Sequence, residues 1–190
     1  MNQAVFKCVC REKVNKEVVS IEREVREVDF TIEWFKKMWE KQYPKYKTLM
    51  GKEIHTFEEF ISFFVRQNFA TDKLESKGIL FSIDDVGIFW VSDLNWPAYA
   101  EVHYTFWDGR LNGRLDLCRK GVKYVFEHYG FKCLYVRVAA YADKHWRFVE
   151  SMGFVKEGIL RSRVKYKETW WDLKCYSLLK HEIANWRLPE

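Results

Sequence analysis

The chain has 190 residues, of which 48% are apolar and 18% aromatic, and its formal net charge is +5. This size and composition predict one globular domain over residues 1–190. No stretch approaches the roughly 18 apolar residues of a membrane span, and the first residues lack the apolar run of a signal peptide, which predicts a cytoplasmic protein without a membrane partner.

The net charge favours negatively charged partners but does not identify one. A balance of +5 fits a phosphate-bearing ligand, a nucleic acid or an acidic protein surface. Nucleic acid is the least favoured of these, because the strongly basic face of a typical nucleic-acid binder is not present. The five cysteines are odd in number, and three fall on apolar faces of expected elements, which predicts packed, reduced thiols and neither disulfides nor a metal site.

The N-terminal third predicts extended structure followed by two helices. Residues 5–28 alternate valines with charges, as in one or two strands or a hairpin. Residues 30–39 carry apolar side chains at helical spacing behind the possible caps Asp29 and Thr31, and Pro44 is expected to stop this helix. Thr56 and Glu59 form a capping box, and the second helix begins there. Its expected apolar stripe consists of Phe57, Phe60, Ile61, Phe64 and Val65.

The middle of the chain predicts an antiparallel meander. Residues 73–77 are expected to form a polar connector. Two apolar runs, 78–83 and 87–91, flank the acidic turn Asp84-Asp85, which is typical of a hairpin. Residues 99–107 then form the next strand.

The second half predicts alternating helices and strands. Residues 115–129 form an amphipathic helix that ends at Gly130. A strand at 133–140, a helix at 144–152 and two long strands at 157–166 and 170–179 follow. Taken together, the predicted strands and helices form an α+β domain with a mixed sheet. The helical crossover predicts that strands 99–107 and 133–140 are parallel neighbours that splay apart at their C-terminal ends.

A basic turn with two glycines, residues 109–114, joins strand 99–107 to the following helix. Free amides and the positive end of the helix dipole converge at such a place, so it predicts a diphosphate site. Arg110, Arg114, Arg119 and Lys120 surround the start of the helix. The alternative is a solvated basic face.

Two segments, residues 152–161 (MGFVKEGILR) and 172–179 (DLKCYSLL), resemble the GCN5-related N-acetyltransferase (GNAT) superfamily. The similarity is strongest to the branch of RimJ- and RimL-type ribosomal-protein N-acetyltransferases. This resemblance implies a mixed sheet of about seven strands flanked by about four helices. It also implies acetyl-CoA as cosubstrate, direct attack by a primary amine of a protein, peptide or small molecule, and a monomer or homodimer.

The resemblance also implies where acetyl-CoA is held. The family turn has the form Q/R-x-x-G-x-G/A, which Arg110 and Gly113 match, whereas Leu115 replaces the final small residue. Ala142 and Val149 stand where the family has an asparagine and a tyrosine. The expected cofactor contacts are Thr105, Trp107, Gly109, Arg110, Leu111, Asn112, Gly113, Arg114 and Leu115. Because of the three departures, a GNAT-fold scaffold without turnover is the alternative function.

Acetyl transfer needs a base for the amine and an acid for the departing thiolate. Glu101 and His103 lie two apart on one strand and share a face, so either is a candidate base. Tyr141 and His145 border the expected cleft and are candidate acids. Cys118 belongs to the buried stripe of its helix, which favours packing over an acyl-enzyme role. Trp96, Trp107, Trp170 and Trp171 are candidates to line an acceptor pocket.

Overall fold

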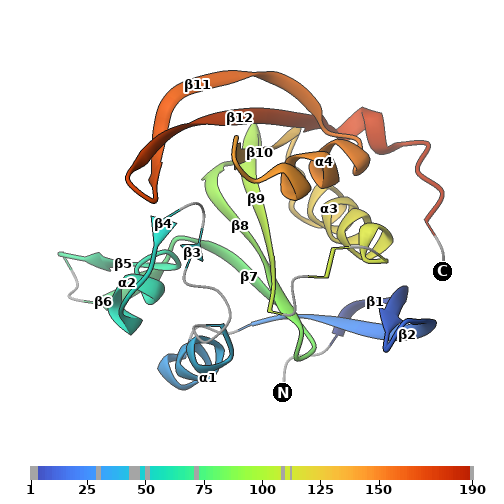
Figure 1. Ribbon diagram of the computed structural model, residues 1–190, viewed down its shortest axis with the longest axis horizontal. Helices are drawn as coiled ribbons and strands as arrows, with labels where there is room; N and C mark the ends of the chain where they lie inside the picture. The colour runs from blue at the N-terminus through green and yellow to red at the C-terminus, as the bar shows by residue number, and fades with distance from the viewer. Residues whose placement is uncertain are drawn as a thin grey trace.

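The computed structural model describes residues 4–28, 31–42, 48–49, 52–70, 73–107, 110–111 and 113–188. Its central element is a mixed sheet of eight strands in the order β1-β2-β7-β8-β9-β10-β12-β11 (Figure 1). The strands are β1 (Ala4–Val14), β2 (Glu17–Glu27), β7 (Gly78–Ile83), β8 (Gly87–Asn95), β9 (Tyr99–Phe106), β10 (Cys133–Ala139), β11 (Val155–Tyr166) and β12 (Thr169–Leu179). The α+β class with a mixed sheet is confirmed, with more strands than the roughly seven expected.

The N-terminal hairpin consists of β1 and β2, paired from Val14↔Glu17 outward. Its turn places Asn15 and Lys16 at φ 49° and 72°, the left-handed conformation that two-residue hairpin turns require. The extended interpretation of residues 5–28 is therefore confirmed as a hairpin. Strand β2 joins the main sheet at its C-terminal end, where Val25, Arg26 and Glu27 pair with β7.

Helices α1 (Ile32–Gln42) and α2 (Phe57–Ile61) follow. Thr31 caps α1, because its hydroxyl accepts from the Trp34 amide at 3.2 Å, while Asp29, Phe30 and Pro44 lie outside the described residues. The capping box of Thr56 and Glu59 is present. The expected continuation of α2 through Val65 is wrong.

The short hairpins β3 (Thr48–Leu49) with β4 (Lys52–Glu53) and β5 (Val65–Asn68) with β6 (Lys73–Ser76) were not predicted. Val65 pairs with Ser76, so the polar segment 73–77 expected as a connector is a strand. Phe64 and Val65 are buried. Two adjacent apolar residues are compatible with the apolar stripe of a helix and with a buried strand, so the sequence alone does not separate the two.

The meander β7-β8-β9 is antiparallel throughout, as predicted. A crossover through α3 (Leu115–Tyr129) returns the chain to β10, which pairs with β9 in parallel. Gly130 ends α3 in the left-handed conformation at φ 74°. Gly121 permits close packing of α3 on the sheet, because a β-carbon there would lie 2.4 Å from the hydroxyl of Tyr104.

The last third consists of α4 (Asp143–Ser151), the long strands β11 and β12, and the 3₁₀ turn η1 (Lys180–Ile183). Strand β11 forms one edge of the sheet, and among the described strands it pairs with β12 alone. The pairing shifts register between Leu160 and Val164. None of the helices in the described part of the chain is long and apolar enough to cross a membrane.

Two cores lie on opposite faces of the sheet. The larger contains Val122, Val125 and Phe126 of α3, Val149 of α4, and the thiols Cys8, Cys10 and Cys118. The second contains Phe35, Met38, Phe60 and Trp90 and lies beneath α1 and α2. Figure 1 shows α3 and α4 on one side of the central strands and α1 and α2 on the other.

Candidate functional site

Strands β9 and β10 pair over their first three residues and separate beyond Glu101 and Tyr135. Their parallel ladder pairs Tyr99 with Cys133, Ala100 with Leu134 and Glu101 with Tyr135, and it ends there. This confirms the predicted parallel neighbours that part toward their C-terminal ends. Glu101 therefore stands at the mouth of an opening between two strands.

Arg137 of β10 holds Glu101. Its guanidinium donates two hydrogen bonds to the carboxylate, Nε to Oε1 at 2.8 Å and Nη2 to Oε2 at 2.5 Å. The Glu101 side chain is 2% exposed and that of Arg137 is 39% exposed. The hydrogen bonds that Arg137 donates to Glu101 raise the pKa of Arg137. The pair fixes the direction of a buried carboxylate, because a bidentate contact constrains both groups.

His103 lies on the same face of β9, two residues further along. Its Nε2 is 2.8 Å from the Ser92 hydroxyl and 3.6 Å from Glu101 Oε2. The imidazole stacks on Trp90, with ring centroids 4.5 Å apart. Burial and the nearby charge of Arg137 lower the pKa of His103 to about 3, so this side chain is neutral at pH 7. A neutral imidazole with so low a pKa is a weak base.

Glu101, His103 and Arg137 line a cavity of about 1320 Å³ on the face of the sheet opposite α3. Its walls carry both signs of charge, in the acidic residues Glu53, Glu59 and Asp93 and the basic residues Arg66, Lys77, Arg163 and Lys165. Phe63, Leu94 and Trp170 supply apolar surface. Trp170 thus lies where an acceptor pocket was expected, whereas Trp96, Trp107 and Trp171 are not part of this lining.

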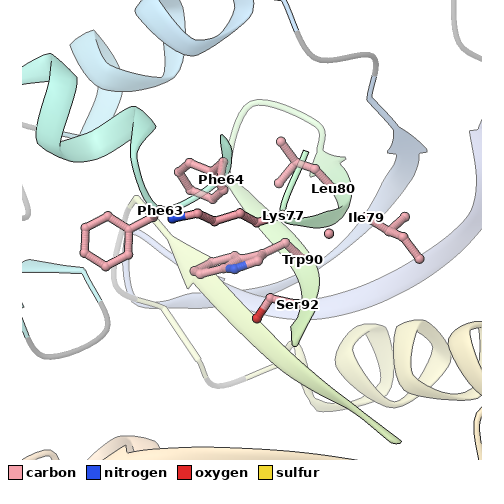
Figure 2. A pocket seen from close by; sticks show the side chains of 8 residues that line it. Phe63, Phe64, Lys77, Ile79, Leu80, Trp90 and Ser92 are labelled. Atoms are coloured by element: carbon pink, nitrogen blue, oxygen red, sulfur yellow. The ribbon is translucent and has the colours of Figure 1, made fainter. Parts of the chain in front are cut away.

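A second, small cavity of about 10 Å³ adjoins the first and shares Phe63, Lys77, Trp90 and Ser92 with it. Figure 2 shows Lys77 crossing between Phe64 and Trp90, with Ser92 below the indole in this view. The Lys77 ammonium donates to the carbonyl oxygen of Ser62. This contact ties the end of α2 to the wall of the larger cavity.

The start of α3 offers backbone donors on the other face. Its N-cap residue, Arg114, makes no side-chain capping bond. The amides of Leu115, Asp116 and Leu117 have no acceptor within the helix, as in the first turn of any α-helix, and the ladder begins where the Cys118 amide donates to the Arg114 carbonyl at 3.0 Å. Arg110 is exposed and Leu111 and Leu115 are half-buried. An uncapped helix start beside an opened ladder fits the diphosphate and the amide-bearing arm of a CoA molecule.

The Arg114 side chain does not lie where the sequence predicted it. Its side chain is fully buried and paired with Glu12 of β1, with Nη2 2.7 Å from Oε2. Its amide donates to the Leu111 carbonyl at 3.2 Å. The expected contact between its guanidinium and a diphosphate is therefore wrong, because the group points into the protein toward a carboxylate.

Trp107, an expected cofactor contact, also lies elsewhere. It is 3% exposed and belongs to the second core, so its side chain does not face the α3 side where the cofactor was expected. Thr105 is half-buried and pairs with Ile88 of β8. Gly109 and Asn112 lie outside the described residues.

Tyr141 and His145 do not join Glu101 and His103. Tyr141 stacks on Tyr166 with centroids 4.5 Å apart and meets Trp171 edge-on. His145 is exposed in the first turn of α4, and neither side chain lines the cavity. Cys118 is fully buried, and burial raises the pKa of its thiol well above the ordinary value, as expected of a packing residue.

Sequence reasoning missed Arg137, Ser92 and Trp90. Arg137 carried a usable signal, because it is the single charged residue in the apolar strand β10 (CLYVRVA). A lone charge in such a strand calls for a partner. Trp90 and Ser92 alternate along β8 as ordinary strand residues do, and no local pattern marks them.

Comparison with known protein families finds one match. Residues 86–174, from the end of the β7-β8 turn into β12, match the family model described as "Acetyltransferase (GNAT) domain". A comparison with curated proteins finds no match.

Several solved structures share the fold. One is the spermidine N-acetyltransferase of Vibrio cholerae in complex with CoA and spermine, with a TM-score of 0.67 and 17% identity over 86% of this chain and 98% of that chain. A dodecameric structure of the same enzyme has a TM-score of 0.65 and 16% identity, over 86% and 96%. A GNAT-family acetyltransferase of Bacillus anthracis has a TM-score of 0.60 and 17% identity, over 84% and 95%. The chain therefore has the fold of these acetyltransferases.

Proposed function

We propose that this protein transfers the acetyl group of acetyl-CoA to a primary amine by direct attack in a ternary complex. The amine nitrogen attacks the thioester carbon, a C–N bond forms, and the C–S bond breaks. The amine loses a proton and the departing thiolate gains one. No acyl-enzyme is required, which agrees with the buried position of Cys118.

The observation that carries this proposal is the opening of the β9/β10 ladder at Glu101, directly above a cavity of about 1320 Å³. CoA would approach from the side of α3, where the uncapped helix start can hold its diphosphate. The acceptor would enter through the cavity on the opposite face. The two reactants then meet in the opening, and this positioning supplies much of the rate.

We assign Glu101 the role of binding the acceptor amine and accepting its proton. Its carboxylate faces the cavity and is held in one orientation by Arg137. It can attract an ammonium ion and accept its proton, directly or through a water molecule. His103 is the weaker candidate because its pKa is lowered to about 3. In this scheme His103 holds Ser92 and borders the acceptor.

The acceptor classes to test follow from the resemblance and from the solved structures. RimJ- and RimL-type enzymes act on protein N-termini, and one structure with this fold contains CoA and spermine. The cavity wall carries both carboxylates and cations. Peptides with a free N-terminus, lysine-containing peptides, and polyamines therefore make up the panel.

The test measures CoA release and the mass of the product when the purified protein is incubated with acetyl-CoA and each amine. We expect acetylation of at least one class, and loss of most of that rate in Glu101→Gln. Binding of acetyl-CoA without transfer to any amine would favour the scaffold alternative. Absence of acetyl-CoA binding, measured by calorimetry, would refute acetyl transfer and leave the scaffold alternative.

A further inference from the structure

The turn before α3 is attached to the N-terminal hairpin by a buried ion pair. Arg114 is fully buried and donates to Glu12 of β1 through both ends of its guanidinium, Nε to Oε1 at 2.9 Å and Nη2 to Oε2 at 2.7 Å. The guanidinium also lies over the ring of Phe106 of β9, 4.6 Å from the centroid. Side chains from β1, β9 and the helix start therefore meet at one point.

A second guanidinium completes the cluster. Arg23 of β2 donates to the same carboxylate, Nε to Oε1 at 3.0 Å and Nη2 to Oε2 at 3.1 Å. Burial raises the pKa of Glu12, but the hydrogen bonds from Arg114 and Arg23 outweigh it and lower the pKa overall. Glu12 is thus a buried carboxylate between two cations, one from the hairpin and one from the turn.

The backbone at the turn is equally constrained. Gly113 has φ 83°, and a β-carbon there would lie 1.8 Å from the carbonyl oxygen of Arg11. Arg114 Nη1 also donates to the carbonyl oxygen of Arg110 at 3.0 Å. Gly113 and Arg114 are therefore held against β1, close to the first-turn amides of α3.

From this geometry we propose that Glu12 is a positioning residue for CoA, acting through Arg114. This inference rests on the proposed function. Glu12 holds the turn so that the amides at the start of α3 are already oriented when the diphosphate arrives. A preorganised site binds more tightly, because its ordering cost does not fall on the binding step. Arg114 contributes by anchoring the turn and does not itself contact the ligand.

The primary experiment measures the Kd of CoA by calorimetry for the full-length wild-type protein and for Glu12→Gln. We expect binding to weaken about tenfold. The KM of the amine acceptor should stay within about twofold, because the acceptor cavity lies on the other face of the sheet. Phe35→Leu in the second core is the matched control: it lowers the melting temperature but should leave the Kd of CoA unchanged.

A double-mutant cycle tests the route of the effect. If Glu12 acts through Arg114, then Arg114→Met should weaken CoA binding about as much as Glu12→Gln, and the double variant should be no weaker than either single variant. Additive losses would mean that Arg114 contacts the ligand itself, which would overturn the proposal.

Two further outcomes are decisive. A wild-type protein that binds no CoA would refute the proposed function and this inference with it. If the wild-type protein binds CoA and Glu12→Gln binds it with the same Kd, this inference is refuted and the proposed function is not. If Glu12→Gln does not fold, Arg23→Gln takes its place, since it removes one partner of the carboxylate at the edge of the cluster; an unchanged Kd in that variant overturns the proposal.

Discussion

Arg137 binds both carboxylate oxygens of Glu101 across the strands β9 and β10, two residues beyond Tyr135, the last residue of β10 that pairs with β9. The ion pair thus bridges two strands at the place where their backbone ladder stops. It holds the carboxylate in one orientation at the wall of the cavity. The first two predictions concern this pair.

Glu101→Gln should lower kcat/KM for acetyl transfer about a hundredfold at pH 7 and much less near pH 9 to 10, where more of an amine with a pKa near 10 is already neutral. A pH–rate profile from about pH 6.5 to 10 measures this. Glu53→Gln, a carboxylate that lines the same cavity, is the control and should keep the wild-type profile. An equal loss at every pH would contradict a role in deprotonation.

Arg137→Met should lower the free energy of unfolding by about 1–3 kcal/mol, because it leaves the buried carboxylate of Glu101 without its partner. Arg137→Lys should lose less, since it keeps the charge but not the planar two-bond contact. Urea unfolding measures both. Arg163→Met, an exposed arginine on the cavity wall, serves as control and should change stability by less than about 0.5 kcal/mol.

The stability of the wild-type protein should rise as the pH increases from about 3 to 6.5, because the unfolded chain protonates His103 in this window and the folded chain does not. One proton of difference corresponds to about 1.4 kcal/mol per pH unit. His103→Asn should flatten the slope between about pH 4.5 and 6.5, where carboxylates contribute little. His181→Asn, at an exposed site, should leave it intact. An unchanged slope in His103→Asn would contradict the burial of a neutral imidazole.

Gly121→Ala should destabilise the protein although alanine favours helices by about 1 kcal/mol, because its β-carbon would lie 2.4 Å from the Tyr104 hydroxyl. The Tyr104 ring cannot move aside easily, since it stacks between Phe89 and Phe106. Combining Gly121→Ala with Tyr104→Phe should recover part of the loss, despite removal of the hydrogen bond from Tyr104 to the Cys118 carbonyl. Thermal unfolding of the single and double variants measures this coupling. Equal stability of Gly121→Ala and wild type would show that the helix can shift.

Much of this fold follows from local patterns. The apolar runs at 78–83 and 87–91 around an acidic turn, the strand at 99–107 and the helical stripe of 115–129 predict the meander and the crossover that the structure contains. The boundary between α2 and β5 does not follow, because Phe64 and Val65 are apolar in a spacing that suits either structure. There, pairing of Val65 with Ser76 decides the outcome.

The site shows where local patterns stop. The sequence places Glu101 and His103 on one face, but the partner of Glu101 lies 36 residues later and that of Arg114 lies 102 residues earlier. An arginine beside a glycine turn is equally suited to a phosphate and to a carboxylate of the same protein. Only the three-dimensional position of Glu12 decides between them.

The outermost strand has a further consequence. Strand β11 spans 12 residues, and one side of its backbone has no strand partner within the described part of the chain, an arrangement that invites pairing with another chain. Its register shift between Leu160 and Val164, with Ser162 at φ 50°, bends the strand at its middle. Arg161, Arg163 and Lys165 add positive charge along the same stretch. A bend and a run of positive charges at a sheet edge disfavour flat pairing with a second copy, so this stretch of β11, which also lines the cavity, protects the edge from sheet-to-sheet aggregation.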